Sequence, residues 1–125
     1  MSTFLLLLFL VTAGVNAAAQ LLLKRGSLDL PGILAETPNW TFRIVKILAN
    51  PFVLGAVVLL GAGMFVWIWL ISKVELSRAY PINIALTILI AFFASVPLFH
   101  ESLTALKLAG AGLILAGLWL MLAYT

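Results

Sequence analysis

Four long apolar segments alternate with short polar stretches along the chain. They cover residues 3–23, 51–72, 79–99 and 103–124, and each has 21 or 22 residues. As a helix, such a segment spans about 30 Å, the thickness of the hydrocarbon core of a bilayer. A helix also satisfies its own backbone hydrogen bonds, which lipid cannot do. The pattern therefore predicts an all-α membrane protein, with one four-helix transmembrane domain over residues 1–125.

The polar connections between these segments differ in length. The second and third are short, so we expect the second, third and fourth helices to be antiparallel neighbours. The first runs from Arg25 to Asn50 and is loop-like as far as Asn39.

The end of this first connection, residues 38–50, has a two-sided pattern. Its apolar side chains fall on one helical face and its polar ones on another: Trp40, Ile44, Ile47 and Leu48 against Arg43, Lys46 and Asn50. This pattern predicts an interfacial helix between the first two transmembrane helices, with Trp40 as an anchor at the lipid headgroups. A helix packed on the ends of the bundle is the alternative.

The first apolar segment also has a feature of a signal peptide. The run Ala17-Ala18-Ala19-Gln20 resembles a cleavage site. However, no Lys or Arg precedes the segment, and its basic residues, Lys24 and Arg25, follow it. We therefore expect a retained helix.

Composition and charge agree with a membrane protein. The chain is 65% hydrophobic and 9% charged, which is too apolar for a soluble domain of this length. It has no cysteine, so disulfides and thiolate metal sites are excluded. A net charge of +3 bears on topology here, and no nucleic-acid partner is expected.

Basic residues favour one orientation in the membrane. Five lie at the first and third connections, against two at the second: Lys24, Arg25, Arg43, Lys46 and Lys107 against Lys73 and Arg78. This bias favours a cytoplasmic position for the first and third connections, with both termini outside.

Polar residues within the apolar segments form two stripes. The first helix carries Thr12, Asn16, Gln20 and Lys24 at four-residue intervals, and the third carries Tyr80, Asn83 and Thr87. Polar groups are costly in hydrocarbon unless they face protein or water. The stripes therefore predict a shared wet groove, and interhelical hydrogen bonding is the alternative.

Features of an enzyme are missing from this pattern. No carboxylate lies deep in an apolar segment, and His100 has no metal-ligating partner nearby in the sequence. Glu101 precedes the fourth helix, where it would act as a capping residue or as a functional one. We expect no catalytic residues, no metal and no cofactor.

The fourth helix has a face of small residues. Gly112 and Ala116 are four apart, and Gly110 and Gly117 are seven apart. Such a face lets helix backbones approach closely. It predicts a packing seam for a homodimer, or for a heterodimer with a similar four-helix subunit.

Several short motifs together resemble the four-helix members of the drug/metabolite transporter superfamily, which include the small multidrug resistance and short EamA-like proteins. They are Gln20 to Lys24, Leu76 to Ile82 (LSRAYPI), His100-Glu101, and Gly110-x-x-Leu113-Ile114-x-x-Gly117. The resemblance spans all four helices and implies a membrane transporter.

Two departures argue against the proton-coupled multidrug pumps of that superfamily. Asn16 stands where those pumps carry a glutamate, and Asn83 where they carry a tryptophan. An amide cannot exchange a proton near neutral pH, and the loss of the aromatic ring removes a surface for cations.

The chain is more similar to the flippase subunits that move 4-amino-4-deoxy-L-arabinose-phosphoundecaprenol across the bacterial inner membrane. That resemblance implies a multi-pass inner-membrane protein whose partners are membrane lipids, a lipid-linked substrate and a similar subunit. It also implies that Lys24, Arg78 or Lys107 meets a phosphate. The substrate-binding residues expected are Asn16, Gln20, Lys24, Arg78, Tyr80, Asn83, Thr87 and Glu101. An exporter of small polar or cationic solutes and a non-transporting membrane partner are the alternatives.

Overall fold

The computed structural model describes residues 2–36 and 39–123, and within these ranges it contains six helices and no strand. They are α1 (Thr3–Ser27), α2 (Leu30–Glu36), α3 (Trp40–Ala49), α4 (Pro51–Lys73), α5 (Leu76–Phe99) and α6 (Ala105–Ala123). Four of them, α1, α4, α5 and α6, are long and apolar enough to cross a membrane. The predicted all-α class with four membrane-spanning helices is thus confirmed.

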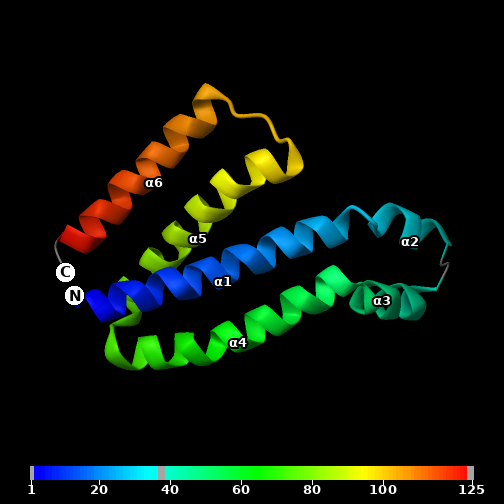
Figure 1. The fold of residues 1–125 in the computed structure, drawn as a ribbon, viewed down its shortest axis with the longest axis horizontal. Coiled ribbons are helices and arrows are strands. Elements are labelled where there is room, and N and C mark those ends of the chain that lie inside the picture. The colour runs from blue at the N-terminus through cyan, green and yellow to red at the C-terminus, as the bar shows by residue number, and fades with distance from the viewer. Residues whose placement is uncertain (1, 37–38, 124–125) are drawn as a thin grey trace.

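The helix α1 lies at the centre of the arrangement (Figure 1) and packs against both α4 and α5. The helices α4 and α5 follow one another through a tight turn but make few contacts, because α1 lies between them. The expectation that these two helices are neighbours is therefore wrong, since a short connection brings together only the ends of the helices that it joins. The expectation holds for α5 and α6, which pack side by side.

Local sequence explains several helix ends. The Ser2 hydroxyl accepts from the backbone N–H of Leu5 at the start of α1. The Asn50 carboxamide accepts from the N–H of Phe52, and Pro51 occupies the first turn of α4, where its missing N–H costs nothing. At the end of α5, His100 adopts the left-handed conformation with φ 54°, which turns the chain toward α6.

Several helix ends differ from the expected ones. The helix α1 continues through Lys24 and Arg25 to Ser27, and α5 begins at Leu76. The expected loop after Gly26 contains the short helix α2. The expected last residue of the fourth helix, Tyr124, and the expected first residue of the interfacial segment, Pro38, lie outside the described residues.

The buried core lies toward the end of the bundle where α1 begins and α4 turns into α5. Phe9, Leu70 and Ile82 have no exposed surface there. Small residues complete the packing of α1, since Ala13 and Ala17 are also fully buried and allow neighbouring helices to approach closely. At the other end α5 diverges from α1 (Figure 1), and this divergence leaves room for the pockets lined by the ends of these two helices.

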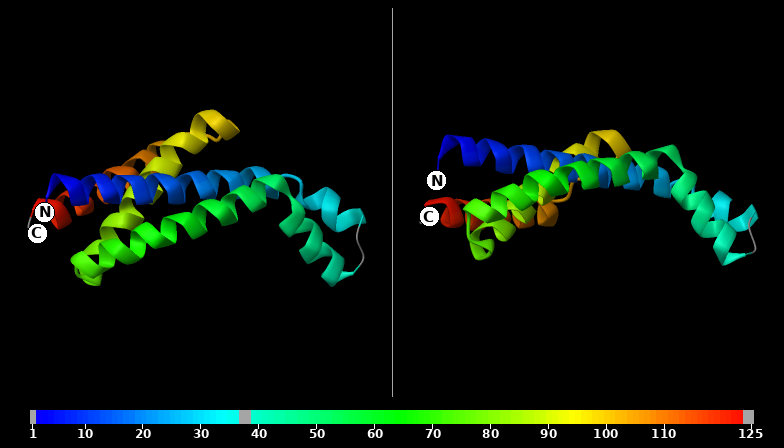
Figure 2. Two further views of the ribbon diagram at one scale, coloured as in Figure 1. Left: turned by 60° about the horizontal axis from the view of Figure 1, so that its bottom comes forward. Right: turned by 90° about the horizontal axis from the view of Figure 1, so that it is seen from below.

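The helices α2 and α3 project sideways from the far ends of α1 and α4 (Figure 2). None of the described residues of α3 is buried, and most of its large apolar side chains are more than half exposed: Trp40, Phe42, Ile44, Val45 and Leu48, but not Ile47. The helix therefore does not cover the end of the bundle with its apolar side chains. Its predicted position at the membrane interface stays a prediction.

Candidate substrate site

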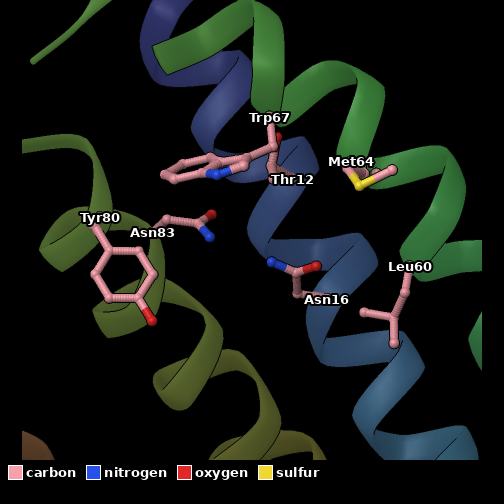
Figure 3. A pocket seen from close by; sticks show the side chains of 8 residues that line it. Thr12, Asn16, Leu60, Met64, Trp67, Tyr80 and Asn83 are labelled. Carbon is pink, nitrogen blue, oxygen red and sulfur yellow. The ribbon is translucent and has the colours of Figure 1, made fainter. Parts of the chain in front are cut away.

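A polar cavity of about 220 Å³ lies among α1, α4 and α5 (Figure 3). At roughly 30 Å³ for each molecule of liquid water, it has room for about seven waters or for one sugar ring. It is partly open to the surface. Its lining comes from three helices: Thr12, Asn16, Leu60, Gly63, Met64, Trp67, Tyr80 and Asn83.

The cavity brings together three of the predicted substrate-binding residues. Asn16 lies midway along α1, and Tyr80 and Asn83 lie one turn apart on α5. The carboxamides of Asn16 and Asn83 face each other across the cavity (Figure 3). Asn83 is only 6% exposed, and its carboxamide oxygen has no hydrogen-bond partner among the described residues. Because an unsatisfied buried polar atom costs about 1–3 kcal/mol, this oxygen is an acceptor available to water or to a ligand.

The threonine hydroxyls of the two stripes are satisfied within their own helices. The Thr12 hydroxyl donates to the Leu8 carbonyl at 2.9 Å, and the Thr87 hydroxyl donates to the Asn83 carbonyl at 2.8 Å. In the described ranges, no side-chain hydrogen bond joins α1 to α5. The stripes therefore do not bind these two helices to each other by hydrogen bonds within one protomer.

Two aromatic side chains line the cavity, of which the sequence pattern predicted only Tyr80. The rings of Trp67 and Tyr80 lie 6.4 Å apart at an interplanar angle of 56°, and Trp67 comes from α4 rather than from α5. Asn83 removes the aromatic ring at its own position, but Trp67 and Tyr80 bring two other aromatic rings to the cavity. Trp67, Met64 and Leu60 were missed because α4 carries no polar side chain in its middle, although their spacing places them on one helical face.

The other predicted substrate-binding residues lie outside this cavity. Gln20 is exposed on α1, one turn beyond Asn16, and Thr87 is one turn beyond Asn83. Arg78 lies near the start of α5, half-buried, and its Nε has no hydrogen-bond partner in the described part of the chain. Lys24 and Glu101 lie at the opposite end of the molecule from Arg78.

Lys24 and Glu101 line a second pocket, of about 390 Å³, where α1 and α5 end. The two side chains do not form an ion pair with each other or with another described residue. Glu101 does not cap the following helix, because Thr104 accepts from the backbone N–H of Lys107 in that role, so the capping interpretation is wrong. The Lys107 ammonium donates to the Ser102 carbonyl at 2.8 Å, so its charge lies at the third connection, where the count of basic residues placed it.

The predicted seam on α6 faces away from α5. The helix packs on α5 through Ala111 and Leu118, which are its buried residues. Gly110 is half-buried, and Gly112, Ala116 and Gly117 are exposed. A β-carbon added at any of these three glycines would meet no atom within 4 Å. The small-residue face is thus left open in the single chain.

The helices and the cavity define the class of the molecule, a small multi-pass membrane protein with a polar site among its spans. Comparison with known proteins narrows it further. The chain is 34% identical over 117 residues to the probable 4-amino-4-deoxy-L-arabinose-phosphoundecaprenol flippase subunit ArnF of Photorhabdus laumondii, covering 90% of this chain and 91% of that protein. It is 33% identical over 121 residues to the probable subunit ArnE of Pseudomonas aeruginosa, covering 97% and 96%.

The chain therefore belongs to the family of the ArnE and ArnF flippase subunits, and the resemblance seen in its motifs is confirmed. A match to the ArnE of Aeromonas salmonicida, at 35% identity, covers 59% of this chain and 64% of that protein's length. Relatives of both kinds match at similar identity, so the comparison assigns the family rather than one subunit type. No family model and no solved structure matches the chain. With its four membrane-length helices, the chain is a multi-pass protein of the bacterial inner membrane.

Proposed function

We propose that this chain is a subunit of a flippase for a sugar linked to undecaprenyl phosphate, of the kind named for its relatives. The observation that carries the proposal is the buried Asn83 carboxamide, whose unpartnered oxygen faces an open polar cavity among membrane-spanning helices. Such a group is costly in an apolar bundle. It is useful where hydroxyl donors of a sugar replace those of water.

In this proposal the carboxamides of Asn16 and Asn83 exchange hydrogen bonds with the headgroup while the polyprenyl chain stays in lipid. The substrate of the relatives also carries an amino group, and an ammonium is attracted to the faces of Trp67 and Tyr80. Basic residues lie at both ends of this route, Lys24 at one and Arg78 at the other. They would hold the phosphate before and after crossing. Gln20 and Thr87 extend the polar stripes beyond the cavity.

The partner in this proposal is a second four-helix subunit, either another copy or a similar chain. The relatives are named as subunits. The open face of Gly112 and Gly117 on α6 gives a second helix close access. The cavity in one chain is small, so we expect the complete route to form between two subunits.

Flipping of a labelled undecaprenyl-phosphate aminosugar in proteoliposomes tests the proposal, with the chain alone and with a similar subunit. We expect Asn83→Leu and Asn16→Leu to lower the rate about tenfold or more, because each removes a hydrogen bond worth roughly 1–1.5 kcal/mol and dries the cavity. The control is Ser95→Ala, since the Ser95 hydroxyl donates to the Phe92 carbonyl of its own helix and does not line the cavity. Full-rate flipping by both leucine variants would exclude this route.

Export of small cationic solutes is a second candidate, favoured by the Trp67–Tyr80 pair in the cavity. Efflux of a fluorescent aromatic cation from the same proteoliposomes separates the two functions. Efflux without lipid flipping would assign the chain to the exporters. Full-rate flipping by a similar subunit without this chain would assign it a non-transporting role.

A further inference from the structure

An apolar groove of about 450 Å³ runs along a different face of α1 from the central cavity. Leu21 of the groove follows Asn16 by five residues, which turns the helix by about 140°. The groove lies between the second half of α1, the start of α4 and the end of α5. Its lining is apolar except for one guanidinium: Ala18, Leu21, Leu22, Arg25, Phe52, Leu98 and Phe99.

The groove adjoins the pocket of Lys24 and Glu101. Arg25, Leu98 and Phe99 line both spaces, so an apolar channel and a charged pocket meet at these three residues. Leu98, in the last turn of α5, is a large apolar side chain that is 61% exposed. Together the two spaces form an opening between α1 and α5, because α5 diverges from α1 at this end (Figure 1).

The charged side chains at this junction suit a ligand that carries both a positive and a negative group. The Arg25 guanidinium lies 4.6 Å from the centre of the Phe52 ring and 3.6 Å from the Asp29 carboxylate, which fixes it at the mouth of the groove. Lys24 and Glu101 have no ionic partner among the described residues, although they line one pocket. One unpaired cation and one unpaired anion beside an apolar channel match an amphiphile whose headgroup is zwitterionic.

We infer that this junction is the binding site at which the lipid substrate enters, an inference that rests on the proposed function. The polyprenyl chain lies in the apolar groove, the phosphate lies against Lys24 and Arg25, and the sugar ammonium pairs with Glu101. The first polar stripe then connects the two sites. From Lys24 through Gln20 to Asn16, each four-residue step rotates about 40° around α1, which leads the headgroup to the central cavity.

Binding to the full chain in detergent, measured by native mass spectrometry, tests the charged part of the site. The probes are undecaprenyl-phosphate aminoarabinose and the same lipid with its amine acetylated, which cannot carry the positive charge. We expect Lys24→Gln to weaken both probes about fivefold, since a basic residue near a lipid phosphate contributes about 1 kcal/mol. We expect Glu101→Gln to weaken only the free amine, and so to abolish the preference between the two probes.

The controls are Lys46→Gln on α3 and Glu75→Gln in the turn before α5, neither of which lines the pocket. They should leave both affinities unchanged. Equal effects of Glu101→Gln on the two probes would overturn the assignment of the ammonium. Equal competition by phosphatidylethanolamine, which also carries a phosphate and an ammonium, would overturn the choice of a polyprenyl substrate.

A bulky side chain placed in the groove tests the apolar part of the proposed site. Leu21→Trp should weaken both probes several-fold, and Val58→Trp on the exposed surface of α4 should not. The melting temperature of both tryptophan variants shows whether either one is misfolded. The Lys24→Gln and Glu101→Gln variants test the site independently of the groove. Flipping is measured separately. If wild-type protein flips the lipid while none of these variants alters binding, the entry site is wrong and the flippase function stands; no flipping under any pairing rejects the function itself.

Discussion

Carboxamides, rather than carboxylates, line the central cavity at the level of single residues. Asn16 and Asn83 keep their donors and acceptors at every physiological pH, so they suit a neutral hydroxyl surface better than proton exchange. Sequence identified these residues because polar side chains stand out in an apolar segment. It did not identify Trp67, because a tryptophan in an apolar helix is equally suited to lipid, and only the packing of α4 against α1 shows which face it occupies.

Replacement of Asn16 by its isosteric acid tests the role of the amide. Asn16→Asp adds a titratable group to the cavity without changing its shape. We expect the flipping rate of this variant, relative to wild type, to vary between mildly acidic and mildly alkaline buffers. A constant ratio across that range would mean that residue 16 does not contact the moving headgroup.

The aromatic pair makes a prediction about selectivity. A cation over an aromatic face gains about 0.5–2 kcal/mol, so Trp67→Leu should slow an aminosugar lipid more than its N-acetylated form. Trp67→Tyr, which keeps an aromatic face, should retain most of the difference. The two lipids are compared at equal loading in the same vesicles, and equal slowing of both would show that Trp67 acts through packing alone.

Individual helices were predictable to different degrees. Length and hydropathy located all four long helices, since the bilayer requires such segments whatever their neighbours are. The short helix α2 was missed because Pro31 and Gly32 resemble loop residues. The order of packing was also missed. Only the structure shows that α1 separates α4 from α5, because sequence proximity does not determine which helix faces make contact.

Close packing of α1 on α4 depends on particular glycines. A β-carbon at Gly63 would lie 3.1 Å from a methyl group of Val15, whereas one at Gly61 would meet nothing within 4 Å. Gly63→Ala should therefore lower the free energy of unfolding by about 1–3 kcal/mol. Gly61→Ala is the matched control and should be neutral or stabilising by up to about 1 kcal/mol. Unfolding by a denaturing detergent measures both, and equal stability of the two variants would contradict the close approach.

The open face of α6 makes a prediction about assembly. Leucines at Gly112 and Gly117 should reduce cross-linked dimer in membranes, because their side chains hold a second helix away. Ala62→Leu adds bulk to an exposed position of α4 and is the control. Undiminished dimer in the double variant would place the subunit contact on another helix.

At the scale of the whole molecule, the two ends differ in their number of basic residues. The start of α1 and the end of α6 lie together at one end (Figure 1). The other end carries α2, α3 and the connection before α6, with Lys24, Glu101 and Lys107 around the proposed entry site. If the excess of basic residues sets the orientation, the substrate enters from the cytoplasmic leaflet and leaves past Arg78.

The chain of 125 residues has no cysteine, so single cysteines can report this orientation without a background. We expect Ser102→Cys and Lys46→Cys to react with an impermeant maleimide only in inverted vesicles, and Ser72→Cys only in right-side-out cells. Within α3, Ile44→Cys should react more slowly than Lys46→Cys, because the exposed apolar face of that helix would lie among lipid headgroups. Equal reactivity at positions 44 and 46 would remove α3 from the interface. Labelling of Ser102→Cys from the outside would reverse the direction of transport, since the Lys24–Glu101 pocket would then receive the headgroup after it crosses.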